Sequence, residues 1–267
     1  YEVLPWVIDV EAAMRPDAPI LHDHIRFDGK PSNIAGKLEH KLGDAEAGFA
    51  EAEVVVERSF RTEPVHQGYI EPHACLAAYY PDGQGEIWSS SQGHFVVRGL
   101  TAKLIGMKLG DLKVNPAEIG GGFGGKTTVF IEPVALALSR KAGRPVKMVM
   151  ARSEVFRATG PTSSTSIDLK IGMRRDGTIT AAFAENRFQG GAFPGSPVDM
   201  GAMCSFACYA LENVQSVGYD VVTNRPKQAA YRAPGSPMAT FAVESVIDEL
   251  CQRLNLDPIE VRLKNAA

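Results

Sequence analysis

The stretch that most constrains the fold is Glu118-Ile-Gly-Gly-Gly-Phe-Gly-Gly-Lys126, in which five glycines surround one aromatic residue. Glycine lets the backbone take positive φ values and leaves N–H groups unobstructed by side chains, which a loop that cradles a phosphate or another anion requires. A helix after the loop would add the positive end of its dipole. The sequence therefore predicts an anion-binding glycine loop, with a purely structural glycine turn as the alternative.

The same stretch satisfies the P-loop pattern GxxxxGK[ST] over residues 120–127. A strand pattern before it and a helix pattern after it also fit, so a P-loop nucleotide hydrolase is a second interpretation. Against it, Phe123 and the extra glycines are unusual for a P-loop. No apolar run supplies a Walker B aspartate, and strands and helices do not alternate as βαβ units.

Hydrophobic patterns on both sides of the glycine loop predict a mixture of strands and helices. The expected strands are residues 53–62, 74–80, 86–90, 112–118 and 146–151, with a hairpin of 166–173 and 178–186 around Arg174-Arg-Asp-Gly177. The expected helices are residues 95–104, with a stripe of Val96, Leu100 and Leu104, then 131–141 and 239–254. This mixture predicts an α+β fold of mixed sheets with packed helices, and not a doubly wound sheet.

Composition excludes several classes of protein. With 267 residues the chain can hold one large domain or one and a half, and its net charge of −3 shows no footprint for nucleic acid or an anionic membrane. Its apolar runs, such as 134–138 and 200–211, are far shorter than the roughly 20 residues of a membrane span. Cys75, Cys204, Cys208 and Cys251 form no CxxC pair, so neither an iron–sulfur cluster nor a zinc site is expected. We expect reduced core cysteines in a cytosolic protein, with Cys204 and Cys208 on one helix face.

Both ends of the chain favour a fragment or a processed chain. The sequence begins at Tyr1 without Met, and residues 1–10 are interpreted as a strand in mid-course. Residues 260–267 follow a helical pattern and do not resemble a natural tail. We therefore expect that more sequence follows.

Two further loops carry polar residues that suit a ligand. Arg232 is a lone cation in the Pro/Gly-rich segment Ala229-Ala-Tyr-Arg-Ala-Pro-Gly-Ser-Pro237, where it could pair with an anionic cofactor oxygen or simply lie on a surface turn. Gln92 lies in Ser89-Ser-Ser-Gln-Gly-His94, between a strand and a helix. Its amide could face a ligand, or Ser91 or Gln92 could cap the helix.

Taken in order, these motifs resemble the molybdenum hydroxylases, the group of xanthine dehydrogenase, aldehyde oxidoreductase and carbon monoxide dehydrogenase. The resemblance extends from about Gly43 to the end and disposes of the P-loop interpretation. Its motifs are Pro64-Val-His-Gln-Gly-Tyr-Ile-Glu-Pro-His73, Ser91-Gln92, Ile119-Gly-Gly-Gly-Phe-Gly-Gly-Lys126, Ala142-Gly-Arg-Pro-Val-Lys147, Ala230-Tyr-Arg-Ala-Pro-Gly235 and Ala242-Val-Glu-Ser-Val-Ile-Asp-Glu-Leu250.

The resemblance implies a fold of the molybdenum-cofactor-binding type and a cofactor, molybdopterin, in its simple form or as the cytosine dinucleotide. Residues 1–42 are expected to be the end of a hammerhead-like domain and a linker, and 43–267 the first molybdopterin-binding domain, with the second one absent from this chain. The resemblance assigns Gln92 to an oxo ligand of molybdenum and Gly122, Phe123 and Gly124 to the metal-dithiolene group. It places Arg232 beside the molybdenum centre. No side chain is expected to ligate the metal directly.

Departures from the family pattern bear on the substrate. Thr127 stands where purine-oxidising members have a substrate-gripping glutamate, Met200 aligns near a substrate-binding arginine, and Pro234 replaces an aromatic residue. These three residues are assigned to the substrate pocket. They disfavour a purine and leave an aldehyde, an aromatic or heterocyclic compound, or an acyl-CoA-type substrate open.

The resemblance also implies that the catalytic base is a glutamate of the second domain, so no catalytic residue is assigned in this chain. Glu118, Glu132 and Glu185 do not match the motif of that base. We expect a cytoplasmic oxidoreductase that inserts water-derived oxygen into a C–H bond and is incomplete as a lone chain. Its expected partners are a second molybdopterin-binding domain or subunit, iron–sulfur and FAD-containing modules, and a small-molecule substrate. The alternative is a non-catalytic binding or assembly module of the same fold.

Overall fold

The computed structural model describes residues 1–267, and their contacts divide the chain into two compact units. The large unit comprises Tyr1–Val65, Ser163–Gln228 and Ala233–Ala267. The other unit comprises His66–Thr162 and Ala229–Arg232 and contains the glycine loop, so we call it the glycine-loop unit. Neither unit is continuous in sequence.

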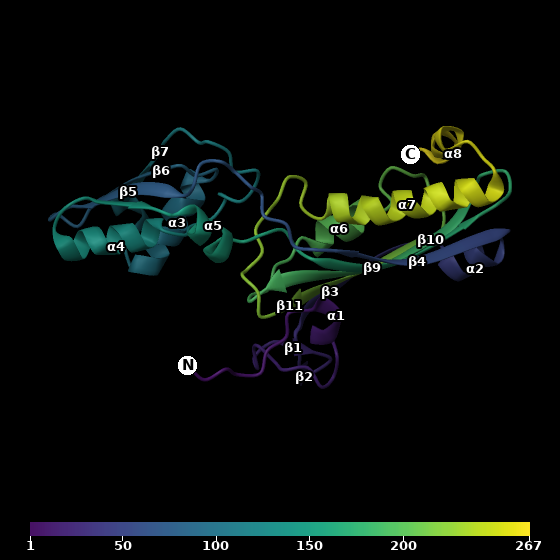
Figure 1. The fold of residues 1–267 in the computed structure, drawn as a ribbon, viewed down its shortest axis with the longest axis horizontal. Coiled ribbons are helices and arrows are strands. Elements are labelled where there is room, and N and C mark those ends of the chain that lie inside the picture. Colours follow the sequence, from purple (N-terminus) through teal and green to yellow (C-terminus); the bar gives the residue numbers. More distant parts are fainter. The chain divides into compact units, whose positions relative to one another are not determined.

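The glycine-loop unit is a mixed four-stranded sheet in the order β7-β6-β5-β8 (Figure 1). Strands β6 and β7 are parallel and the other pairs antiparallel. Helices α3 and α4 cover one face of the sheet, where Cys75, Ala77, Ile87, Leu112 and Leu136 form the core. The elements are β5 (Ala74–Tyr79), β6 (Gly85–Ser89), α3 (His94–Ile105), the 3-10 turn Leu109–Asp111, β7 (Leu112–Pro116), α4 (Glu132–Ala142), β8 (Val146–Val149) and α5 (Arg152–Ala158).

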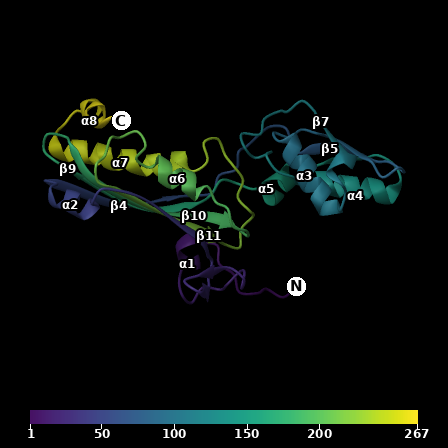
Figure 2. The same cartoon turned by 180° about the vertical axis from the view of Figure 1, so that it is seen from behind.

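The large unit is built on a five-stranded sheet in the order β3-β11-β10-β9-β4, in which only β10 and β11 are parallel. Figure 2 shows α6 and α7 along one face of this sheet and α1 at the opposite face. The strands are β1 (Arg26–Phe27), β2 (Lys30–Pro31), β3 (Ile34–Leu42), β4 (Val54–Thr62), β9 (Thr165–Met173), β10 (Ile179–Gly191) and β11 (Val214–Val222). The helices are α1 (Val10–Ala13), α2 (Ala45–Ala50), α6 (Val198–Cys204), α7 (Ser236–Leu254) and α8 (Pro258–Asn265).

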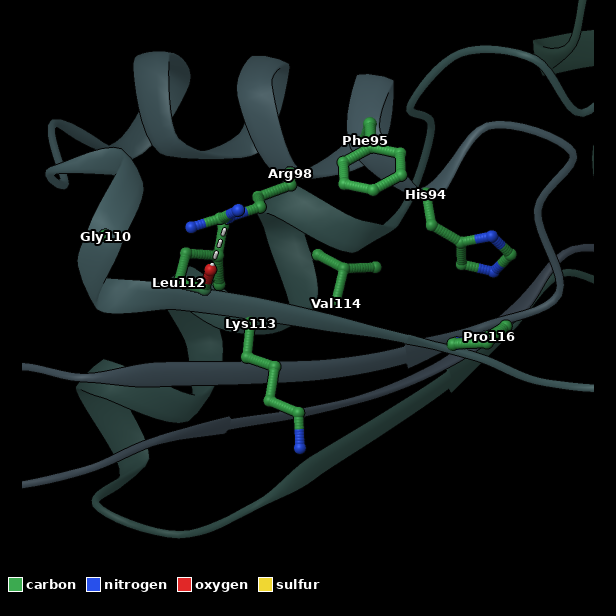
Figure 3. A pocket seen from close by; sticks show the side chains of 8 residues that line it. All are labelled: His94, Phe95, Arg98, Gly110, Leu112, Lys113, Val114 and Pro116. Atoms are coloured by element: carbon green, nitrogen blue, oxygen red, sulfur yellow. Dashed lines mark hydrogen bonds between the residues drawn. The ribbon is translucent and has the colours of Figure 1, made fainter.

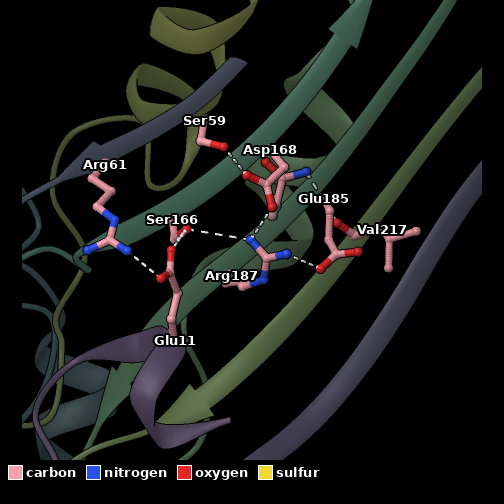
Figure 4. Close-up of polar contacts among 9 residues, drawn as sticks. Glu11, Ser59, Arg61, Ser166, Asp168, Glu185, Arg187 and Val217 are labelled. Carbon is pink, nitrogen blue, oxygen red and sulfur yellow. Dashed lines mark hydrogen bonds and ion pairs between the residues drawn. The ribbon is translucent and has the colours of Figure 1, made fainter. Parts of the chain in front are cut away.

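A polar network fixes α1 to the sheet of the large unit (Figure 4). Glu11 of α1 accepts a hydrogen bond from Ser166 Oγ at 2.6 Å and pairs with Arg61. Arg187 of β10 pairs with Asp168 at 2.7 Å and also with Glu185. The face of the sheet beneath α1 therefore carries charges of alternating sign. The opposite face is apolar, and its residues Ile167, Leu169 and Ile171 form one core with Val243, Val246, Ile247 and Leu250 of α7.

The sequence predictions of the fold class and of the main elements are confirmed. Both sheets are mixed and carry packed helices, as expected for α+β. The predicted hairpin is formed by β9 and β10, whose turn closes when Gly177 N–H donates to Arg174 O at 3.0 Å. None of the helices combines the length and the apolar character that crossing a bilayer requires.

Three sequence expectations are wrong. Residues 1–8 form no strand, and the chain first becomes regular at α1. The stripe of Val96, Leu100 and Leu104 does not face the core, because α3 buries Val97, Thr101 and Ala102. Cys208 lies beyond the end of α6 and is exposed, so it does not share a buried helix face with Cys204.

Candidate functional site

The glycine loop, residues 120–126, connects β7 to the segment before α4 and has backbone angles that glycine favours. Gly121, Phe123 and Gly124 have φ of 93°, 51° and 102°. Gly125 N–H donates to Gly122 O at 2.7 Å and closes a tight turn inside the loop. Helix α4 begins only at Glu132, so its dipole does not act at the loop as the sequence predicted. This separation is also unlike a P-loop, in which the helix follows directly.

The packing around the loop leaves no room for side chains at three glycines. A Cβ atom would lie 2.5 Å from Gln92 Oε1 at Gly122, 2.5 Å from Ala230 O at Gly124 and 2.7 Å from the Tyr69 ring at Gly125. These distances are far below ordinary carbon contacts. The glycines therefore allow Gln92, the 229–232 segment and Tyr69 to approach the loop backbone.

Gln92 holds the loop through one end of its amide. Its Oε1 accepts hydrogen bonds from Gly124 N–H at 2.9 Å and Lys126 N–H at 3.1 Å. Its Nε2 donates to no group of the protein, and the side chain is exposed. Helix α3 begins after Gly93 without a side-chain cap, so the capping alternative for Ser91 and Gln92 is wrong. The amide orientation instead presents two donors away from the loop.

Other donors around the loop are equally free. The N–H groups of Gly121, Gly122 and Phe123 have no hydrogen-bond partner in the protein. Arg232 donates its backbone N–H to Phe123 O at 2.9 Å, whereas its exposed guanidinium makes no ion pair. Thr127 uses its hydroxyl to donate to Gly124 O at 3.0 Å. The structure thus brings together Gln92, Gly122, Phe123, Gly124, Thr127 and Arg232 in one unit.

Met200 and Pro234, the other two residues assigned to a substrate pocket, belong to the large unit. Met200 lies in α6 with 44% of its surface exposed, and Pro234 precedes α7. The next residue, Gly235, packs against the backbone of Pro197 and Gly201. Within their unit these two segments are neighbours, and their role at a substrate stays a prediction.

A buried polar cluster beneath the loop was not assigned from the sequence. The Lys126 side chain is fully buried, and its Nζ donates to Glu71 Oε2 at 2.7 Å. Burial would raise the pKa of Glu71, but the hydrogen bonds from Lys126 and Gly120 outweigh it and lower the pKa. The sequence held only one signal for this pair: Glu71 and Lys126 each lie in one of the motifs shared with the family.

The two histidines beside this cluster make hydrogen bonds to side chains of the same unit. His73 is 3% exposed, and its Nε2 lies 2.8 Å from the Tyr69 hydroxyl. Burial, assisted by the positive charge of Lys126, lowers the pKa of His73 to about 4. His66 Nε2 lies 2.9 Å from Thr159 Oγ1, and burial also lowers the pKa of His66. No group of three or more His, Cys, Asp or Glu side chains could hold a metal ion.

The three glutamates considered from the sequence have different environments. Glu118 is exposed and makes no hydrogen bond or ion pair within the protein. Glu132 is buried and accepts hydrogen bonds from Ser89 Oγ at 2.7 Å and Phe130 N–H at 2.9 Å. Glu185 pairs with Arg187 in the large unit. Two of the three carboxylates are thus occupied by structural partners.

A separate cavity of about 490 Å³ lies between α3 and β7 of the same unit (Figure 3). None of the site residues assigned from the sequence lines it. Arg98 is fixed there by donating to Leu109 O and Leu112 O, and Phe95 is 87% exposed. The remaining lining residues are His94, Gly110, Leu112, Lys113, Val114 and Pro116.

Unpaired backbone donors on a glycine loop are a feature typical of domains that bind an anion or an anionic cofactor. Residues 26–266 match the family model described as "Molybdopterin cofactor-binding domain". The chain therefore belongs to the molybdopterin cofactor-binding domain family of the molybdenum hydroxylases.

Individual relatives of this family are similar over the whole chain. The probable hypoxanthine oxidase XdhD of Escherichia coli K12 is 28% identical over 99% of this chain and 31% of its own length. The nicotinate dehydrogenase large molybdopterin subunit of Eubacterium barkeri is 28% identical over 100% of this chain and 62% of its own. The solved aldehyde oxidoreductase of Desulfovibrio gigas has a TM-score of 0.88 and 28% identity, covering 100% of this chain and 29% of that one. The chain thus spans less than two thirds of each of them.

Proposed function

We propose that this chain is the molybdopterin-binding portion of a cytoplasmic molybdenum hydroxylase that oxidises a C–H bond with oxygen from water. The observation that carries the proposal is the set of unpaired donors at one loop: the N–H groups of residues 121–123, the Gln92 amide and the Arg232 guanidinium. Such a set suits an oxygen-rich anionic group, because each donor lacks a competing partner in the protein. When bound, the molybdenum cofactor, molybdopterin with its molybdenum, supplies a metal that can accept two electrons.

The residues of the chain would bind and orient that group. The loop backbone offers fixed donors that need no rearrangement, since Gln92 and the 229–232 segment already hold the loop. Gln92 Nε2 is assigned to an oxo ligand, and residues 122–124 to the metal-dithiolene group. Arg232 is assigned a place beside the metal centre. Mass spectrometry of the bound pterin distinguishes the simple form of the cofactor from the cytosine dinucleotide.

The substrate pocket residues favour an aldehyde or an aromatic or heterocyclic compound over a purine. Thr127 carries no charge, and its hydroxyl is engaged by Gly124 O. Met200 and Pro234 offer neither a cation nor an aromatic ring. We assign the catalytic base to a second molybdopterin-binding domain or subunit, and electron transfer to iron–sulfur and FAD-containing partners.

The proposal is tested by separating the two ends of the Gln92 amide. Gln92→Glu keeps an acceptor for Gly124 and Lys126 but removes the free donors and adds a negative charge. We expect the variant to fold normally and its molybdenum and pterin content per chain to fall about tenfold, the loss of one charge-assisted contact. In Gln92→Ala we expect both the molybdenum and pterin content and the stability of the loop to fall, because the acceptor for Gly124 and Lys126 is also removed. Metal analysis, pterin mass spectrometry and circular dichroism measure these results.

The matched control is Gln84→Glu, which makes the same chemical change at an exposed turn of the same unit. It will leave the cofactor content unchanged. The wild-type protein should be purified gently, together with the polypeptides that accompany it. If this preparation holds no molybdenum, the proposal is refuted. That result would favour the non-catalytic binding or assembly module.

Arg232 provides a second, independent prediction. Because its guanidinium makes no bond within the protein, Arg232→Ala will leave the free energy of unfolding unchanged while the molybdenum content falls several-fold. Arg232→Lys will retain only part of the content, since an ammonium lacks the planar pair of donors. Unfolding in urea and metal analysis on the same samples test this, and equal loading of all three proteins would contradict it.

A further inference from the structure

We infer that Glu71 is a positioning residue that clamps the two ends of the glycine loop together, with Lys126 as its buried counter-charge. The expected effect on cofactor loading rests on the proposed function, whereas the clamp itself does not. The Glu71 carboxylate makes no hydrogen bond to Gln92 or Arg232 and is bonded to Gly120 and Lys126, so its action on the site is through the loop.

One carboxylate oxygen joins both ends of the loop. Glu71 Oε2 accepts from Gly120 N–H at 2.7 Å and from Lys126 Nζ at 2.7 Å. The backbone adds a further link, because Glu71 N–H donates to Gly120 O at 3.1 Å. A Cβ at Gly120 would lie 2.6 Å from Glu71 Cβ, so the absence of a side chain permits this close approach. The first and the last residue of the loop are thereby fixed to the same atom.

The ion pair is strongly constrained because the ammonium is isolated from water. The Lys126 side chain is 0% exposed, and Glu71 is its only acidic partner. The Tyr69 ring, whose centroid lies 5.1 Å from Nζ, gives additional cation–π stabilisation. A buried charge that loses its partner is strongly destabilising, whereas replacing the whole pair by neutral groups is tolerated.

The clamp acts on the part of the loop that displays the free donors. Residues 121–123 lie between the two clamped ends, and the Gln92 amide holds the loop at Gly124 and Lys126. Because Lys126 is buried and paired with Glu71, its positive charge is neutralised within the protein. The contribution of the loop to anion recognition therefore depends on the geometry of its N–H groups, which the clamp helps to fix.

The test compares Glu71→Gln with Glu118→Gln, which removes the same charge two residues before the loop at a carboxylate without partners. Hydrogen exchange of residues 118–127 reads the loop directly, with or without a cofactor. We expect exchange of the protected loop amides to be about tenfold faster in Glu71→Gln and unchanged in Glu118→Gln. Molybdenum content should fall in the first variant alone.

The double variant Glu71→Gln with Lys126→Met separates positioning from plain stability. Removing the buried charge should restore the melting temperature, but the bridge between the loop ends stays broken. Fast loop exchange and low molybdenum content should therefore persist. A double variant in which loading and exchange return together with the melting temperature would overturn the inference, as would wild-type exchange in Glu71→Gln. If the wild type holds no molybdenum the proposed function fails, and the exchange comparison still decides whether the clamp exists.

Discussion

Replacing Gly124 by alanine is expected to destabilise the glycine-loop unit by about 2–4 kcal/mol and to abolish retention of molybdenum. The new Cβ would lie 2.5 Å from Ala230 O and 2.7 Å from its carbonyl carbon. Both are backbone atoms, so a side-chain rotation cannot relieve the overlap. The φ of 102° at Gly124 adds backbone strain for any residue with a Cβ.

The surroundings of Ala230 explain why the clash cannot be absorbed. Ala230 O accepts a hydrogen bond from Gln67 Nε2 at 2.8 Å, and Arg232 N–H donates to Phe123 O at 2.9 Å. Moving the 229–232 segment away would break these bonds and carry Arg232 away from the loop. We therefore expect stability and cofactor content to fall together.

The glycine-loop unit can be followed separately, because the chain has 2 tryptophans and only Trp88 lies in this unit. Urea unfolding monitored by fluorescence in a Trp6→Phe background reports on it. Gly99→Ala is the matched control, since nothing lies within 4 Å of that Cβ position in α3. Alanine there should stabilise the helix by about 0.5–1 kcal/mol. Equal stability of Gly124→Ala and the wild type would contradict the packing argument.

Local signals in the sequence were sufficient for the elements bounded by strong turns. The turn after Met173 and the Pro81–Gly85 connection determine two antiparallel pairs without long-range information. Periodicity alone did not reveal which face of α3 is buried, because Val96 and Leu100 are as apolar as a core stripe would be. Strand β3 was missed, since most of its residues are polar or exposed. The division into two units depends on contacts between distant segments.

For the site too, local motifs could be predicted from the sequence and contacts between distant residues could not. Gln92, residues 122–124 and Arg232 lie in motifs that can be recognised along the chain, and the structure brings them together. The pair of Glu71 and Lys126 joins residues 55 positions apart, so only the folded chain reveals it. The roles of Thr127, Met200 and Pro234 depend on a substrate and stay predictions.

The second large effect concerns pH, and its origin is the burial of His73. The imidazole is 3% exposed, packs edge-on against Phe130 and lies 2.8 Å from the Tyr69 hydroxyl. Burial in the first place, and then the charges of Lys126 and His66, lower the pKa of His73 to about 4, against the opposing influence of Glu71. In the unfolded chain the same group titrates near its ordinary value of 6.5.

The sign of the effect follows from proton binding. Between pH 6.5 and 4 the unfolded state binds a proton that the folded state refuses, so stability falls as the pH falls through this window. From pH 7.5 to 5 the loss should be about 2 kcal/mol. His66 adds to it in the same direction, because burial lowers its pKa too. The lowered pKa of Glu71 means that its contribution is lost only at lower pH, as the carboxylate protonates.

Unfolding in urea at pH 7.5, 6 and 5, followed by Trp88 fluorescence in the Trp6→Phe background, measures this loss. His73→Gln can still hydrogen-bond to Tyr69 but does not titrate, so most of the pH dependence should disappear although the variant is less stable at pH 7.5. His24→Gln removes an exposed histidine of the large unit and should leave the dependence unchanged. An unaltered slope in His73→Gln would show that other groups cause the acid sensitivity. If the pH dependence disappears in His73→Gln and persists in His24→Gln, the buried cluster under the glycine loop excludes a second positive charge beside Lys126.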